Sequence, residues 1–89
     1  MWSFPLTMNQ SKTHWNYRVL VYNDVEGLYF RIHEVYYADG VPNGYSQPGA
    51  AVSGSTSSDL KNCLLRMKEA TEKPFLWAEE RFPEEYKPE

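Results

Sequence analysis

Hydrophobic and polar residues alternate along two stretches of the chain, residues 15–22 and 28–37, which are rich in β-branched and aromatic side chains. A period of two with this composition is typical of β-strands. The sequence between the two stretches is Asn-Asp-Val-Glu-Gly, and Gly27 can adopt the positive φ that closes a tight hairpin. Asp-Gly and Asn-Gly turn signals follow, so the pattern predicts an antiparallel hairpin and a third strand at about residues 41–47.

The hairpin register can be predicted by placing Tyr22 opposite Tyr29. Residues directly opposite one another point to the same face of a sheet. We expect the face that packs in the core to carry Trp15, Tyr17, Val19, Val21, Leu28, Phe30, Ile32 and Tyr36. The outer face then carries Arg18, Leu20, Tyr22, Tyr29, Arg31, His33, Val35 and Tyr37. A slip of one residue would mix the two sets, and burial of one face opposes that slip.

A helical period begins after a loop of small residues at 48–57. Thr56 with Asp59 resembles a capping box, and Pro74 predicts that the helix ends by Lys73. The apolar stripe of this helix comprises Leu60, Cys63, Leu64, Met67, Ala70 and Thr71. We expect Leu64 to be buried facing Phe30, with Cys63 as a buried thiol, whereas Leu65 projects away from the stripe.

These elements predict an α+β fold, namely a three-stranded antiparallel β-meander with one C-terminal helix packed on one face. A chain of 89 residues makes one domain. We expect a flexible arm at residues 1–12, the domain at 13–77 and an acidic tail at 78–89. Met8 is an alternative start, so the sequence leaves open whether residues 1–7 belong to the native protein. Residues 75–77 are expected to form a short strand or to pack against the helix end.

Composition narrows the function classes. Nine Lys and Arg against 12 Asp and Glu give a charge of −3, which argues against nucleic acid as the partner. Cys63 is the single cysteine, and no stretch reaches the ~20 apolar residues of a membrane span, so we expect a cytoplasmic protein. His14 and His33 lack partners at metal-ligand spacing, and we read His33 as a polar surface residue. We therefore expect no metal, no cofactor and no enzymatic activity.

The outer face of the sheet is the expected binding site, because one helix can cover only one face of a small sheet. Exposed aromatic residues and arginine are enriched at interface hot spots. An ordinary solvent-exposed face is one alternative, and a platform that stacks bases of single-stranded RNA is another. The predicted binding residues are Arg18, Leu20, Tyr22, Tyr29, Arg31, His33, Tyr37 and, from the helix, Leu65.

Several segments resemble a group of small stand-alone bacterial and phage proteins to which no activity is assigned. They are His14-Trp15-Asn16-Tyr17-Arg18-Val19, Ile32-His33-Glu34-Val35-Tyr36-Tyr37, Asp39-Gly40, Gly44-Tyr45 and Lys73-Pro74. This resemblance covers about residues 13–77 and implies a bacterial or phage cytosolic origin. The order strand–strand–strand–helix is also similar to the antitoxins of HicA–HicB pairs, a likeness of layout alone.

The sequence thus predicts a non-enzymatic protein-binding domain, a small regulator or inhibitor of the antitoxin-like or phage anti-defence (anti-CRISPR-like) type. We expect its partner to be another protein, or a second copy in a dimer, reached through the outer face. The alternative is a nucleic-acid-binding module that uses the same Tyr and Arg residues.

Overall fold

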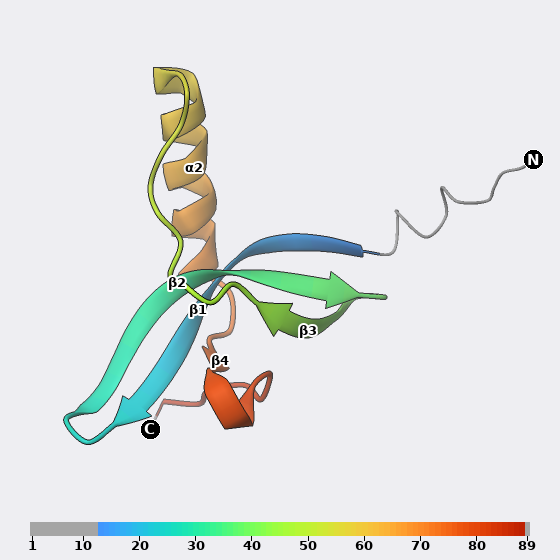
Figure 1. The fold of residues 1–89 in the computed structure, drawn as a ribbon, viewed down its shortest axis with the longest axis vertical. Helices are drawn as coiled ribbons and strands as arrows, with labels where there is room; N and C mark the ends of the chain where they lie inside the picture. Colours follow the sequence, from blue (N-terminus) through green and yellow to red (C-terminus); the bar gives the residue numbers. More distant parts are fainter. Residues whose placement is uncertain (1–12, 89) are drawn as a thin grey trace, which may run out of the picture.

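The computed structural model describes residues 13–88 and has an α+β fold, which confirms the predicted class (Figure 1). The arm predicted at residues 1–12 lies outside the described residues. The elements in chain order are β1 (Thr13–Asp24), β2 (Gly27–Ala38), β3 (Val41–Tyr45), α2 (Ser57–Ala70), β4 (Leu76–Trp77) and the 3-10 helix η1 (Glu79–Arg81).

The hairpin of β1 and β2 has the predicted register, with Tyr22 opposite Tyr29 along a ladder that runs from Thr13 to Asp24. The strands are longer than predicted at both ends: the turn contains only Val25 and Glu26, β1 begins at Thr13 and β2 ends at Ala38. Gly27 has a φ of 116°, in the region that favours glycine. The side chain of Asp24 accepts a hydrogen bond from the Glu26 N–H at 3.0 Å, which tightens the turn.

The sheet has four strands in the order β3-β2-β1-β4, and β4 runs parallel to β1. The prediction of a three-stranded, wholly antiparallel sheet is therefore wrong. Residues 75–77 form the short strand that was one of two expectations, with Leu76 opposite Leu20. A parallel neighbour needs a long crossover connection, and the loop after β3 together with α2 provides one.

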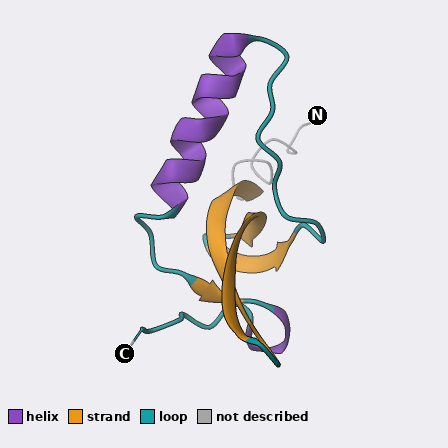
Figure 2. Ribbon diagram, turned by 90° about the vertical axis from the view of Figure 1, so that its left-hand side faces the viewer, coloured by secondary structure: helices purple, strands orange, loops and turns teal. Residues whose placement is uncertain are grey.

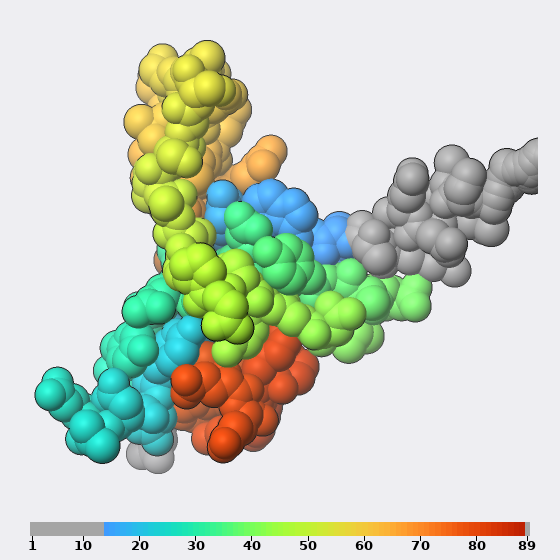
Figure 3. All heavy atoms as spheres, viewed as in Figure 1, coloured from blue at the N-terminus to red at the C-terminus, as the bar shows by residue number. Residues whose placement is uncertain are grey.

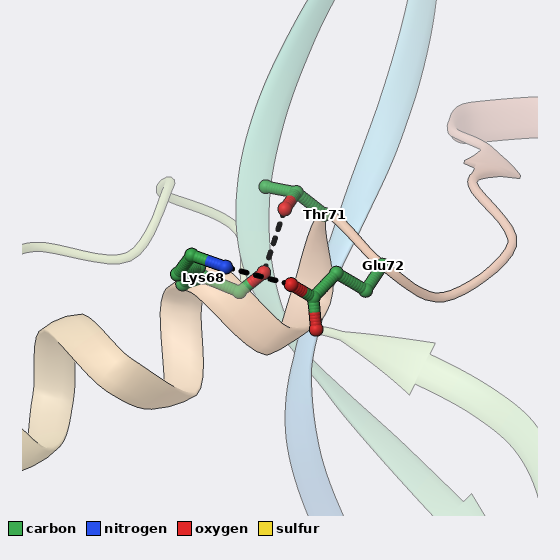
Figure 4. Close-up of polar contacts among 3 residues, drawn as sticks. All are labelled: Lys68, Thr71 and Glu72. Carbon is green, nitrogen blue, oxygen red and sulfur yellow. Dashed lines mark hydrogen bonds and ion pairs between the residues drawn. The ribbon is translucent and has the colours of Figure 1, made fainter.

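Helix α2 has side-chain contacts at both ends. At its start, Thr56 is the N-cap and its hydroxyl accepts a hydrogen bond from the Asp59 N–H at 3.0 Å. At its end, the Thr71 hydroxyl donates to the Lys68 carbonyl at 2.6 Å, and Lys68 forms an ion pair with Glu72 at 2.7 Å (Figure 4). The helix ends at Ala70, earlier than the limit set by Pro74, because Thr71 already serves as its C-cap.

Helix α2 stands away from the sheet instead of lying across it (Figures 1 and 2). Its buried residues are Met67 and Ala70, both in its C-terminal half. The loop after β3 runs beside its N-terminal half, where a Cβ at Gly54 would lie 2.5 Å from the Leu60 nitrogen. The Cα radius of gyration is 15.4 Å, whereas about 12 Å is expected for a compact chain of this length.

Val19 and Val21, on the face predicted to be inside, are buried at 4% and 0% exposed, but the main core lies on the sheet face that was predicted to be outside. It contains Leu20, Tyr22, Val35, Tyr37, Leu76 and Ala78, with Tyr45 and Phe82 packed against them. Phe30 and Leu64, predicted to be core residues, are 50% and 49% exposed, so that prediction is wrong.

The residues after β4 explain this reversal. β3 and β4 lie at opposite edges of the sheet, yet the rings of Tyr45 and Phe82 are 4.9 Å apart. The Glu79 N–H also donates to the Tyr45 hydroxyl at 2.9 Å. The sheet therefore curls, and residues 78–82 close over the enclosed face. Residues beyond the predicted boundary at 77 also pack against the rest of the domain (Figure 3), since Ala78 is buried and the Tyr86 N–H bonds to the Phe75 carbonyl.

Candidate binding surfaces

The structure places the seven predicted binding residues of the sheet on one face but buries four of them. Leu20, Tyr22, His33 and Tyr37 are between 0% and 9% exposed, so they cannot form an accessible binding face. Tyr29, Arg31 and Leu65 are exposed, and Arg18 is half-buried. The pairing of these residues across the hairpin was predicted correctly, but their face was wrongly predicted to be exposed to solvent. The residues that cover this face come after the helix, and the sequence did not indicate that they would pack there.

His33 belongs to a buried polar network and not to the surface. Its Nδ1 lies 2.8 Å from the Ser46 carbonyl oxygen, and its Nε2 lies 2.9 Å from the Tyr22 hydroxyl. A carbonyl can only accept, so Nδ1 carries the proton and Nε2 accepts from Tyr22. Burial lowers the pKa of His33 and outweighs the hydrogen bond to Ser46, which raises it. Both nitrogens are thus satisfied in the neutral ring, which points to a structural role.

Tyr29 and Arg31 form the accessible end of the predicted face. The Tyr29 ring stacks on Tyr22 at 4.8 Å, and the Arg31 guanidinium lies 5.5 Å from the Tyr22 ring centroid and 5.6 Å from that of Tyr29. The Arg31 side chain also lies against Gly49, where a Cβ would lie 2.5 Å from the Arg31 Cδ. Arg31 therefore bridges the core and the loop after β3, and only a small part of the predicted face stays available.

Arg18 joins three parts of the fold. One terminal nitrogen donates to the Tyr37 hydroxyl at 2.7 Å, and the other donates to the carbonyl of Pro74. Because Pro74 follows α2, this contact fixes the end of the helix relative to the hairpin. The position of Arg18 explains its part-burial and assigns it to structure rather than to recognition.

The largest accessible apolar residues on the projecting part of the molecule come from α2 and the neighbouring loop. We call them the leucine surface: Leu60, Leu64 and Leu65, which are 37%, 49% and 59% exposed, and Val52, which is 50% exposed. Of the three leucines, only Leu65 was predicted to be accessible. The length of the helix could have predicted this exposure. Its 14 residues span about 21 Å, which is more than the width of a three-stranded sheet.

A second apolar area lies between the hairpin and the C-terminal segment. Phe30 makes edge-on contacts with Phe75 and Tyr86 at 5.8 and 5.9 Å. These rings, together with Lys73, Pro74, Glu85 and Pro88, line a cavity of about 410 Å³. The contacts explain why Phe30, although half-exposed, is ordered against its own chain.

The residues that could carry chemistry are dispersed in the described part of the chain. Among residues 13–88, no three His, Cys, Asp or Glu residues lie close enough together to hold a metal ion. Cys63 is half-buried and lies 3.6 Å from the Tyr17 hydroxyl, a contact that raises the pKa of Tyr17. The thiol therefore lies at the junction of α2 and β1, and is less buried than predicted.

None of the helices within residues 13–88 combines the length and apolar character that a membrane span requires. Comparison of the chain with models of known protein families, with characterised proteins and with solved structures gives no match.

Proposed function

We propose that the chain is a small, non-enzymatic protein-binding domain, a regulator or inhibitor that acts in the cytoplasm. The observation that supports this function best is the leucine surface. A helix in a small domain normally buries its apolar side, because that burial provides most of its tertiary stability. Here α2 buries only Met67 and Ala70, while its three leucines stay accessible.

The mode of binding that fits this geometry is insertion of α2 into a groove. Leu60 and Leu64 lie one turn apart on the same side of the helix, and Leu65 follows, so the three can act as anchors for an apolar groove. On a helix of 3.6 residues per turn, Lys61 and Lys68 fall between Leu64 and Leu65. In complexes where an amphipathic helix enters an apolar groove, the anchors recur at i, i+3, i+4 and i+7, and Leu60 and Leu64 have the i, i+4 spacing.

The charge of α2 indicates what borders that groove. Lys61 and Lys68 lie beside these leucines on α2, although the whole chain is acidic. A partner with acidic residues at the rim of an apolar groove matches this distribution, since complementary charge steers association and fixes register. We therefore propose another protein with such a groove as the partner, in place of contact through the outer sheet face.

The nucleic-acid alternative needed several accessible tyrosines beside arginine. Tyr22 and Tyr37 are buried, which leaves Tyr29 and Arg31 as the accessible pair on that face. The supporting geometry for base stacking is therefore reduced to a single ring, and we do not propose this function.

The test starts by isolating a partner from host lysate with the wild-type chain and measuring the Kd of the purified pair. Leu64→Ser with Leu65→Ser should cost about 2–3 kcal/mol of binding, roughly 100-fold in Kd. Because both leucines are exposed, stability should change by less than about 0.5 kcal/mol each. The matched control is Tyr29→Ser with Arg31→Ser, which should keep the wild-type Kd. The proposal is wrong if the leucine variant binds normally, or if the control alone abolishes binding.

A further inference from the structure

A polar recess lies between β1 and the C-terminal end of α2, with a volume of about 340 Å³. By helical geometry, Arg66 is on the side of α2 opposite Leu64, whereas Glu69 lies one turn after Leu65, so the recess borders the leucine surface at Leu65. Its volume is within the range of small-molecule sites. Six residues line it: Trp15, Asn16, Tyr17, Arg66, Glu69 and Lys73.

The three charged residues of the recess lack partners within the described chain. Ion pairs among residues 13–88 join Lys68 to Glu72, Arg81 to Glu84 and Lys87 to Glu85, and none includes Arg66, Glu69 or Lys73. Spacing along the helix would allow Glu69 to pair with Lys73, but Lys68 and Glu72 form the pair instead. Two cations and one carboxylate therefore border the same space with their charges unpaired.

Asn16 adds a hydrogen-bond acceptor. Its side-chain oxygen is buried and has no hydrogen-bond partner among the residues described. A buried polar atom without a partner costs about 1–3 kcal/mol. Less than 1 Å² of this oxygen is accessible, so a donor in the recess would gain this stabilisation after a rotation of the Asn16 side chain. Trp15, which is 44% exposed, and Tyr17 are packed edge-on at 5.2 Å and provide an aromatic wall.

We propose that this recess binds a small zwitterion of the α-amino-acid class. The ligand's carboxylate pairs with Arg66 and Lys73, its ammonium donates to Glu69 and to the Asn16 oxygen, and its apolar part lies against Trp15. A simple anion fits less well, because Glu69 would repel it and the Asn16 oxygen would stay without a donor. A simple cation would meet the two positive charges. The zwitterion matches all three charged groups of the recess, and the proposal does not rest on the protein-binding function proposed above.

The experiment is a titration of the ¹⁵N-labelled chain with each standard amino acid at up to about 10 mM, a range that detects weak millimolar binding. The Trp15 indole resonance reports on the recess. We expect at least one amino acid to shift it saturably. Its N-acetyl derivative, which lacks the ammonium, and its amide, which lacks the carboxylate, should each bind at least tenfold more weakly.

Single substitutions test which charged residues of the recess contribute to binding of the amino acid. Arg66→Gln and Glu69→Gln should each weaken binding at least tenfold, while Lys61→Gln, a lysine removed from the recess, should leave it unchanged. All three positions are exposed, so the fold should be kept, and the dispersion of the spectrum verifies this. The proposal is overturned if no amino acid shifts Trp15, if the derivatives bind as well as the parent compound, or if Lys61→Gln weakens binding as much as the recess variants.

Discussion

The Tyr45 hydroxyl, on the edge strand β3, accepts a hydrogen bond from the backbone N–H of Glu79, which lies beyond the opposite edge strand β4. The distance is 2.9 Å. Adjacent strands are about 4.8 Å apart, so the two edges of a flat four-stranded sheet would lie about 14 Å apart. This bond can therefore form only because the sheet curls and residues 78–82 pack over its enclosed face.

Tyr45→Phe should remove this bond and keep the ring that packs on Phe82. Because Glu79 is exposed, water can replace the lost acceptor, and we expect a loss of only about 0.5–1.5 kcal/mol in the free energy of unfolding. Hydrogen exchange should show faster opening at residues 78–86, with β1 and β2 unchanged. Uniform acceleration across all strands would contradict a closure confined to this segment.

The two faces of the hairpin should respond differently to truncation. Leu20→Ala removes a side chain that is 0% exposed and should cost about 2–5 kcal/mol. Phe30→Ala removes a ring that is half-exposed and should cost no more than about 1.5 kcal/mol. Urea unfolding of both variants provides the comparison. A larger loss for Phe30→Ala would mean that the faces are assigned the wrong way round.

The stability of the domain should fall in mild acid because of His33. Burial lowers the pKa of this ring in the folded state, whereas the unfolded chain takes up the proton at about pH 6.5. The stabilisation by the neutral ring is therefore fully present above about pH 6.5 and is lost as the pH falls toward the folded pKa, by up to about 1.4 kcal/mol per pH unit.

Unfolding midpoints in urea between about pH 5 and pH 7.5 test this dependence. His33→Gln should flatten the profile relative to the wild-type slope. If His33→Gln keeps the full slope, the acid sensitivity arises elsewhere in the chain.

Arg18 and Tyr37 should be energetically coupled. Their 2.7 Å hydrogen bond involves a charged donor and a tyrosine that is 8% exposed. A double-mutant cycle with Arg18→Met and Tyr37→Phe should give a coupling of about 1 kcal/mol or more. A coupling below about 0.3 kcal/mol would show that Arg18 acts through its contact with Pro74 alone.

Local patterns predicted the elements and their pairing well. The alternation in β1 and β2 and the turn at Gly27 are properties of neighbouring residues. The register was predicted from the requirement that the side chains of the two hairpin faces stay on separate faces. Thr56 and Asp59 similarly marked the start of α2. These predictions succeeded because each depends on contacts between residues close in sequence or directly paired.

The choice of the buried face could not be predicted in the same way. Both faces of the hairpin carry large apolar residues, so their composition does not decide which one is enclosed. Ala78 and Phe82 decide it, from a segment whose acidic residues and prolines resemble a solvent-exposed tail. The same long-range packing determines which predicted binding residues are accessible, and for that reason the leucine surface emerged only from the structure.

The most direct test of the leucine surface is the solvent exposure of leucine methyl groups, measured by relaxation from a soluble paramagnetic probe. In the free protein, the methyls of Leu64 and Leu65 should relax strongly, and those of Leu20 and Leu76 should be protected. Saturation with the isolated partner should protect Leu64 and Leu65 and leave the Tyr29 ring accessible. If both leucines stay exposed in the saturated complex, α2 does not enter the partner and the proposed mode of binding is wrong.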